Sequence, residues 1–109
     1  MLLRECRTVK DKQWFAMQYH GIECQQRKLV EEVHELNEAI TRFETQKKSG
    51  MSGDVSSIIT EIADVKNLLE QIQDLYNINT IDVNLEKTMK IKRHFKEMED
   101  EINGTKVLK

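Results

Sequence analysis

The amino-acid sequence predicts an all-α protein, an antiparallel bundle of about four helices that is completed by oligomerisation. Its 109 residues include no proline and only four glycines, and 33% of them are charged against 39% hydrophobic. That balance is typical of long amphipathic helices rather than of sheets joined by tight turns. A chain of this length buries only part of its apolar surface by itself. We therefore expect a single domain over 1–109 that packs against copies of itself, with flexible tails at about 1–10 and 104–109.

A single glycine separates the first two predicted helices. A short helix over about 11–19 contains Trp14, Phe15 and Met17, and Gly21 ends it. The second helix, over about 22–46, has the clearest amphipathic pattern in the chain, because apolar residues recur three and four positions apart. These residues are Leu29, Val33, Leu36, Ile40 and Phe43.

The second half of the chain predicts two more helices. The polar, glycine-containing segment 47–53 indicates a connector, and Asp54 or Ser56 is expected to cap the helix that follows. This third helix reaches about Tyr76, and a turn over 77–80 separates it from a fourth helix that opens at Thr80 or Asp82. The apolar face of the third helix consists of Ile58, Ile62, Val65, Leu69, Ile72 and Tyr76, and that of the fourth of Leu85, Met89, Phe95, Met98 and Ile102.

Two pairs of acids occupy matching positions on the second and third helices. On a helical wheel of about 100° per residue, Glu32 and Glu35 lie on one shoulder of the apolar stripe, and Glu61 and Asp64 lie on the same shoulder of the next helix. The surrounding segments share one pattern, LVEEVHEL and IITEIADV. Since two helices joined by a short connector usually lie antiparallel, we expect the four carboxylates to converge.

A cluster of four carboxylates at the border of a core predicts a metal site. Like charges repel one another and resist desolvation, so a hard divalent cation is expected to neutralise them. Magnesium fits best, because it takes few carboxylates and leaves positions for water and phosphates, and Mn²⁺ is a substitute. One acidic pair alone is usually a solvated helix face, but two pairs at matching positions favour a metal. His34 lies on the wheel away from the carboxylates, which indicates a surface histidine.

At these residues the sequence resembles the all-α nucleoside triphosphate pyrophosphohydrolase superfamily, which includes MazG-like proteins, dimeric dUTPases and dCTP pyrophosphatases. The residues that carry the resemblance are 28–36 and 61–65, which match the family pattern of ExxE followed, after a loop, by ExxD. The similarity extends from about Trp14 to Phe95. It implies a magnesium-binding helical bundle that is completed by dimerisation, often with dimers pairing into tetramers.

The resemblance also implies an activity. Carried over residue by residue, it makes Glu32, Glu35, Glu61 and Asp64 the metal ligands and the catalytic residues, one of them acting as base on the attacking water. The implied reaction is hydrolysis of an NTP or dNTP between the α and β phosphates, giving a nucleoside monophosphate and pyrophosphate. Which carboxylate activates water, how many metal ions bind, which base and sugar are preferred, and whether the assembly is a dimer or a tetramer stay open.

Further substrate contacts are expected from the fourth helix and from the first. The basic part of the fourth helix resembles the part of the family's last helix that helps hold the triphosphate, with Lys92 as the best match and Arg93 beside it; a solvated basic face is the equal alternative. Trp14 is a candidate to stack on the base, although a lone tryptophan is more often core. Gln25, Gln26 or Asn67 would supply polar contacts to the base, and the sequence does not choose among them.

Three other functions compete with this interpretation. A non-enzymatic helical interaction module would use the apolar stripes only for packing and the acids only for solubility. A di-iron bundle usually needs Glu-x-x-His pairs, and neither acidic motif ends in histidine. Nucleic-acid binding through 87–96 is disfavoured by the acids that follow and by the net charge of -2.

Localisation is predicted from what the sequence lacks. The first ten residues have no apolar core of the kind a signal peptide needs, and no stretch has the length and apolarity of a membrane span. Cys6 and Cys24 have no Cys or His partners at metal-binding spacings, which favours thiols in a reducing compartment. We expect a cytoplasmic protein that binds neither nucleic acid nor membrane.

Overall fold

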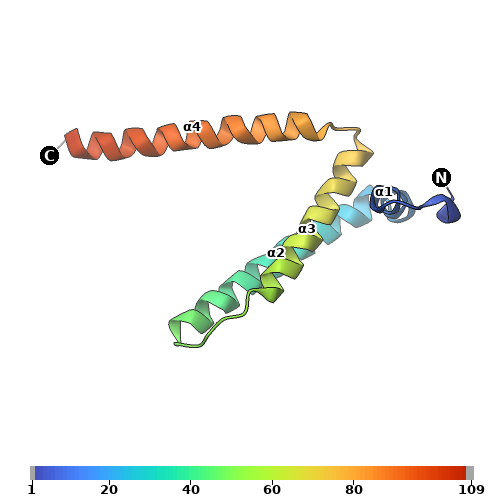
Figure 1. Cartoon of the computed structure of the whole chain (residues 1–109), viewed down its shortest axis with the longest axis horizontal. Coiled ribbons are helices and arrows are strands. Elements are labelled where there is room, and N and C mark those ends of the chain that lie inside the picture. The colour runs from blue at the N-terminus through green and yellow to red at the C-terminus, as the bar shows by residue number, and fades with distance from the viewer. Residues whose placement is uncertain (1, 108–109) are drawn as a thin grey trace. The chain divides into compact units, whose positions relative to one another are not determined.

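The computed structural model describes residues 2–107 and confirms the all-α prediction. A 3₁₀ turn, η1 (Leu3–Glu5), precedes four helices: α1 (Val9–His20), α2 (Ile22–Lys48), α3 (Ser56–Leu75) and α4 (Thr80–Val107), and the described residues include no strand (Figure 1). The helices form two compact units, one ending at Asn77 and one starting at Ile78. Of the predicted tails, residues 2–10 contain η1 and the start of α1, and residues 104–107 form the end of α4. Met1, Leu108 and Lys109 lie outside the described residues.

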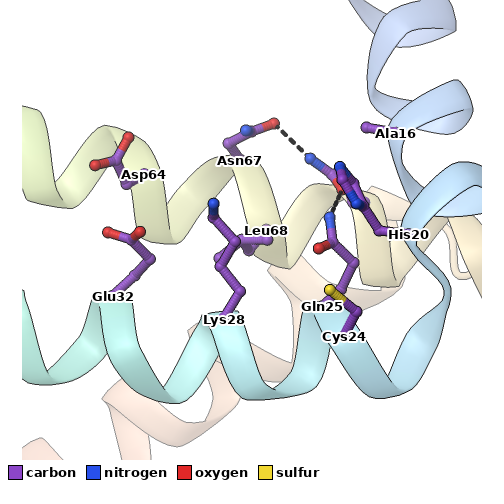
Figure 2. Close-up of a pocket in the computed structure, with 10 residues that line it drawn as sticks. Ala16, His20, Cys24, Gln25, Lys28, Glu32, Asp64, Asn67 and Leu68 are labelled. Atoms are coloured by element: carbon purple, nitrogen blue, oxygen red, sulfur yellow. Dashed lines mark hydrogen bonds between the residues drawn. The ribbon is translucent and has the colours of Figure 1, made fainter.

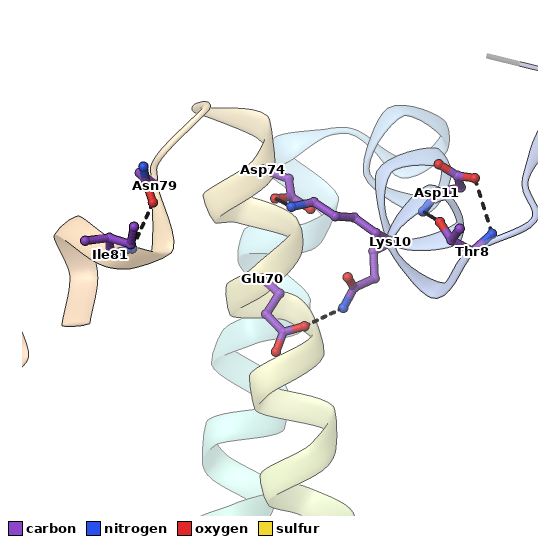
Figure 3. A network of polar contacts seen from close by, with 8 residues as sticks. Thr8, Lys10, Asp11, Glu70, Asp74, Asn79 and Ile81 are labelled. Carbon is purple, nitrogen blue, oxygen red and sulfur yellow. Dashed lines mark hydrogen bonds and ion pairs between the residues drawn. The ribbon is translucent and has the colours of Figure 1, made fainter.

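Local hydrogen bonds determine where the helices begin. Thr8 Oγ1 accepts from Asp11 N at 3.0 Å, and Asp11 Oδ2 accepts from Thr8 N at 3.2 Å, so a capping box starts α1 (Figure 3). At α3 the N-cap position is Val55, and Asp54, one residue earlier, supplies the side-chain acceptor: its Oδ1 accepts from Ser56 N at 2.9 Å. The helix α4 opens at Thr80, one of the two predicted positions, and Asn79 before it caps the helix, because its Oδ1 accepts from Ile81 N at 2.9 Å. Side-chain acceptors at these positions satisfy amides that the helix leaves without partners.

The helices α2 and α3 form an antiparallel hairpin, and α1 packs against both (Figure 1). The break between α1 and α2 is Gly21, whose φ of 82° is open to glycine and strained for other residues. The connector between α2 and α3 is also shaped by a glycine, because a Cβ on Gly53 would lie 2.5 Å from Phe43 Cε2. The aromatic ring of Phe43 therefore closes the end of the hairpin against a residue that has no side chain.

The line of contact between α2 and α3 lies closer to the acidic shoulder than the sequence predicted. Its buried residues are Gln25, Ala39, Leu68 and Gln71. Residues predicted for the middle of the stripes are half-exposed, at 43–48%: Val33, Ile40, Ile62 and Leu69. Each stripe is wider than one neighbouring helix can cover, so a flank of the first unit keeps apolar surface in water.

The helix α4 belongs to the second unit and is exposed along its described length. Every α4 residue whose exposure is described, over 80–104, is exposed, including Leu85, Phe95 and Ile102 at 57–61%. A helix with an apolar face and no core of its own gains its stability from packing elsewhere. Within the described part of the chain, no helix combines the length and apolarity that crossing a membrane requires.

Candidate metal centre

The hairpin brings the two acidic motifs together. Glu32 of α2 and both Glu61 and Asp64 of α3 each offer one carboxylate oxygen, and these oxygens all lie within 4.8 Å of one another. Figure 2 shows Glu32 and Asp64 facing each other across the two helices. Glu35, one turn beyond Glu32, is close enough for its charge to raise the pKa of both glutamates in the cluster. The hairpin thus brings together three of the four predicted carboxylates, whereas Glu35 is exposed and is not one of the residues whose oxygens lie within 4.8 Å of one another.

Two oxygens of the cluster are buried without a hydrogen-bond partner. Among the described residues, none donates to Glu32 Oε2 or Glu61 Oε2. Burial, followed by the charges of Glu35 and Asp64, raises the pKa of Glu32 from 4.5 to about 7. A carboxylate that is buried and unpaired strongly disfavours its charged form.

The pKa of Glu61 is raised for the same reasons. Burial is the main cause, and the charges of Glu35 and Asp64 add to it. Cations that would offset this charge are not paired with the cluster, because every ion pair found in the described chain joins other residues. The site therefore holds more negative charge than its own side chains compensate.

This donor set suits a hard divalent cation. Carboxylate oxygens are the ligands that Mg²⁺ and Mn²⁺ prefer, and opposite ligands of an octahedral Mg²⁺ lie roughly 4 Å apart, from bond lengths of about 2.0–2.1 Å. Oxygens spread over 4.8 Å need only small side-chain rotations to reach one ion. Such an ion would satisfy both buried oxygens and remove the repulsion among the acids.

A pocket of about 490 Å³ continues from the carboxylates along the groove between α2 and α3. Glu32 and Asp64 line one end, and Gln25 and Gln71 line the other. Lys28, which is exposed, lies between them, one turn before Glu32 on α2 (Figure 2). The volume falls within the range of small-molecule sites, about 300–1,000 Å³. One continuous pocket thus presents two acids, then the lysine side chain of Lys28, then two amide side chains.

The amide end of the pocket is a chain of hydrogen bonds with a fixed direction. Glu70 Oε2 accepts from Gln13 Nε2 at 2.7 Å, and the same nitrogen donates to Asn67 Oδ1 at 3.2 Å. Asn67 Oδ1 also accepts from Gln71 Nε2 at 3.1 Å, and Gln71 Oε1 accepts from Gln25 Nε2 at 2.6 Å. Gln25 is 3% exposed, and its Oε1 has no partner among the described residues.

The Glu70 carboxylate determines that direction. An ionised carboxylate only accepts, so Gln13 must turn its NH₂ group toward it, and each following amide is then oriented by the one before. The chain ends on Gln25 with an acceptor. What the pocket lacks at this point is an N–H or O–H donor.

Within the first unit, Trp14, Gln26 and His34 do not line the pocket. Lys92 and Arg93 are exposed on α4, in the second unit, so their role in binding phosphates stays a prediction. Trp14 is half-buried on α1, but the residues of α1 that line the pocket are Ala16 and His20. Gln26 is exposed and His34 is a surface residue that pairs with Glu38 at 3.0 Å.

Lys28 and Gln71 are among the pocket residues to which sequence reasoning gave no role in the site. Lys28 belongs to the motif that carries the family resemblance, and its spacing of four from Glu32 placed it on the same helix face. Gln71 lies seven residues after Asp64 and therefore on the same side of α3. A polar residue in line with the acids was the signal that could have found both.

Comparison with known proteins adds no relative: no protein-family model, no curated protein and no solved structure matches the chain.

Proposed function

We propose that this protein is a magnesium-dependent nucleoside triphosphate pyrophosphohydrolase, which hydrolyses an NTP or dNTP to the nucleoside monophosphate and pyrophosphate. One observation carries the proposal: a cluster of partly buried, uncompensated carboxylates lies at one end of a pocket of nucleotide size. The likeness of the two acidic motifs to those of the MazG-like superfamily points to the same reaction class.

The order of groups along the pocket matches the order of groups in a nucleotide. A triphosphate with its cation would lie at the Glu32 and Asp64 end, and Lys28 would offset phosphate charge. The base would lie toward Gln25 and Gln71. Because Gln25 Oε1 is an acceptor without a partner, we expect the base to present an N–H group there.

The roles of the residues follow from their charges. Glu32, Glu35, Glu61 and Asp64 would hold the cation, which when bound supplies Lewis acidity and lowers the pKa of water. A carboxylate of the cluster would accept a proton from the attacking water. Lys28 would stabilise the negative charge that develops on the phosphates.

Assembly and location are part of the same proposal. The half-exposed apolar flank of the first unit and the exposed face of α4 support an oligomer of this chain. The substrates proposed are cytoplasmic metabolites, and we propose a cytoplasmic enzyme for that reason.

The proposal is tested by product analysis. The purified protein is incubated with a panel of canonical and modified NTPs and dNTPs, with Mg²⁺ or with chelator, and the products are separated by anion exchange. We expect monophosphate and pyrophosphate in equal amounts with Mg²⁺, and none with chelator. Glu35→Gln and Asp64→Asn should each lower turnover by at least about 100-fold at unchanged helicity, whereas Glu31→Gln, an exposed acid of the same helix, should retain it.

A failure would have a clear meaning. If no nucleotide were cleaved with any metal, the acids would not form an active site, and the interaction module would become the leading interpretation. Release of inorganic phosphate instead of pyrophosphate would keep a hydrolase but contradict the cleavage position.

A further inference from the structure

The C-terminal half of α4 carries an exposed apolar line with the spacing of a coiled coil. Ile91, Phe95, Met98 and Ile102 follow one another at intervals of four, three and four residues. All four are exposed, at 60%, 61%, 40% and 57%. Alternating steps of three and four keep side chains along one narrow line of a helix. We call these four residues the α4 seam.

The segment 91–102 is self-complementary when it is aligned antiparallel with a copy of itself. Its sequence is IKRHFKEMEDEI, and its centre lies between Lys96 and Glu97. About this centre Ile91 lies opposite Ile102, and Phe95 opposite Met98. Each basic residue or histidine of the first half lies opposite an acid of the second half: Lys92 with Glu101, Arg93 with Asp100, His94 with Glu99, and Lys96 with Glu97.

We propose that α4 pairs antiparallel with α4 of a second copy of this chain along the α4 seam. In such a pair the apolar layers are Ile91 on Ile102 and Phe95 on Met98, each formed twice by the two-fold symmetry. A two-fold axis between Lys96 and Glu97 is sufficient to form these layers, and each layer consists of residues of the α4 seam alone.

The charges beside the seam favour this orientation. In an antiparallel pair of helices, Lys92 lies near Glu99 of the second copy, and His94 lies near its Glu101. A parallel pair in register would keep one opposite-charge contact, His94 near Glu99 of the second copy, but would place Lys87 near Lys92 of that copy. Like charges at such positions destabilise a pair, so the pattern selects antiparallel pairing.

Ion pairs also form within α4, and one of them involves a residue beside the seam: His94 Nδ1 lies 3.9 Å from Glu97 Oε2, a contact that pairing with the second copy would replace. Lys96 Nζ lies 2.8 Å from Asp100 Oδ1, four residues on, and both side chains are exposed. These two residues occupy the outer side of the proposed pair, where an ion pair along one helix does not compete with pairing between copies. Because the seam has only four residues per copy, we expect a reversible association, with a dissociation constant on the order of micromolar.

The test uses the full chain and measures its mass by sedimentation over a range of concentrations. Lys92→Glu and Glu99→Lys each bring two like charges together on both sides of the axis, so each should weaken the association by roughly tenfold or more. The double variant, Lys92→Glu with Glu99→Lys, restores opposite charges and should return the association to the wild-type level. Phe95→Glu, in the seam itself, should halve the mass of the assembly.

Three outcomes would overturn the proposal. A chain that is monomeric at every concentration would show that the seam packs within one molecule or not at all. An assembly whose mass resists both Phe95→Glu and Lys92→Glu would use a different surface. Failure of the double variant to recover what the single variants lose would contradict the antiparallel register. None of these readings depends on nucleotide hydrolysis, so the enzyme proposal stands or falls separately.

Discussion

At the residue scale, Glu32 and Glu61 are two carboxylates that the fold holds in an unfavourable environment, because burial raises the pKa of both. Each has an oxygen that is buried and has no partner within the described residues. A fold keeps such groups at a cost in stability, and functional sites are where proteins commonly retain them.

The raised pKa of Glu32 predicts a dependence of stability on pH. Its pKa is about 7 in the folded protein and 4.5 as its ordinary value, so between these values the folded state binds more protons than the unfolded state. The stability of the metal-free protein should therefore fall as the pH rises from about 4.5 to about 7. In urea unfolding followed by circular dichroism, Glu32→Gln should remove much of this loss, and saturating Mg²⁺ should oppose it most strongly above pH 7.

The opposite slope would count against this account. If the wild-type protein became more stable over this range by the same amount as Glu32→Gln, Glu32 would not be a desolvated carboxylate. The comparison with the variant is needed, because Asp11 and Asp54 have lowered pKa values that hydrogen bonds from backbone N–H groups cause, and these act at lower pH.

The unpartnered acceptor of Gln25 predicts an effect on substrate binding. Gln25→Met keeps the length of the side chain but removes both its unpartnered acceptor and the Nε2 group that donates to Gln71 Oε1, so KM for the preferred nucleotide should rise roughly tenfold or more while kcat changes less. Gln26→Met, an exposed neighbour on the same helix, is the matched control and should leave both constants as they are. An unchanged KM in Gln25→Met would place the base outside the amide end of the pocket.

The amide chain shows what a sequence does not specify about single residues. Gln25 and Asn67 were identified as polar candidates, but their use depends on Gln71, Gln13 and Glu70, which come from two other positions on α3 and from α1. The spacing within one helix is readable from a sequence. The orientation of an amide is not, because it is set by its partner in space.

At the scale of elements, the connector between α2 and α3 depends on the absence of a side chain at Gly53. Gly53→Ala would place a Cβ 2.5 Å from the Phe43 ring, and we expect it to lower the free energy of unfolding by about 1–3 kcal/mol. Gly104→Ala is the control, because it meets nothing within 4 Å and lies inside α4, where alanine favours the helix by up to about 1 kcal/mol. Chemical denaturation measures both changes; equal stability of Gly53→Ala and the wild type would mean that Phe43 does not pack on the connector.

The helices themselves were largely predictable, because periodicity and glycine are local signals. The break at Gly21, the connector after Lys48 and the turn before Thr80 lie where the sequence placed them. Helix starts were less predictable, since Asn79 and the capping box of Thr8 and Asp11 depend on side-chain geometry. The predicted helix bounds therefore differ from those of the structure by a few residues at several helix ends.

At the scale of the whole molecule, the paired motifs predicted the acidic site because the hairpin needed only a short connector. The offsets from the connector are nevertheless unequal, because Glu35 lies 13 residues before the end of α2 at Lys48, whereas Glu61 lies 5 residues after the start of α3 at Ser56. The connector runs back along α2 and so brings ExxE and ExxD together (Figure 1). Membership of an apolar stripe was a poorer guide to which side chains are buried. Val33 and Leu69, each 48% exposed, lie on a flank that one neighbouring helix leaves uncovered.

The most direct test of the central claim is a titration of the protein with Mn²⁺, followed by the electron paramagnetic resonance signal of the free ion, with Mg²⁺ as competitor. The account predicts saturable Mn²⁺ binding that Mg²⁺ displaces, that Asp64→Asn weakens by at least about tenfold, and that Glu31→Gln leaves unchanged. Binding of equal strength in the wild type and in Asp64→Asn, or no saturable binding at all, would contradict a metal centre at Glu32, Glu61 and Asp64.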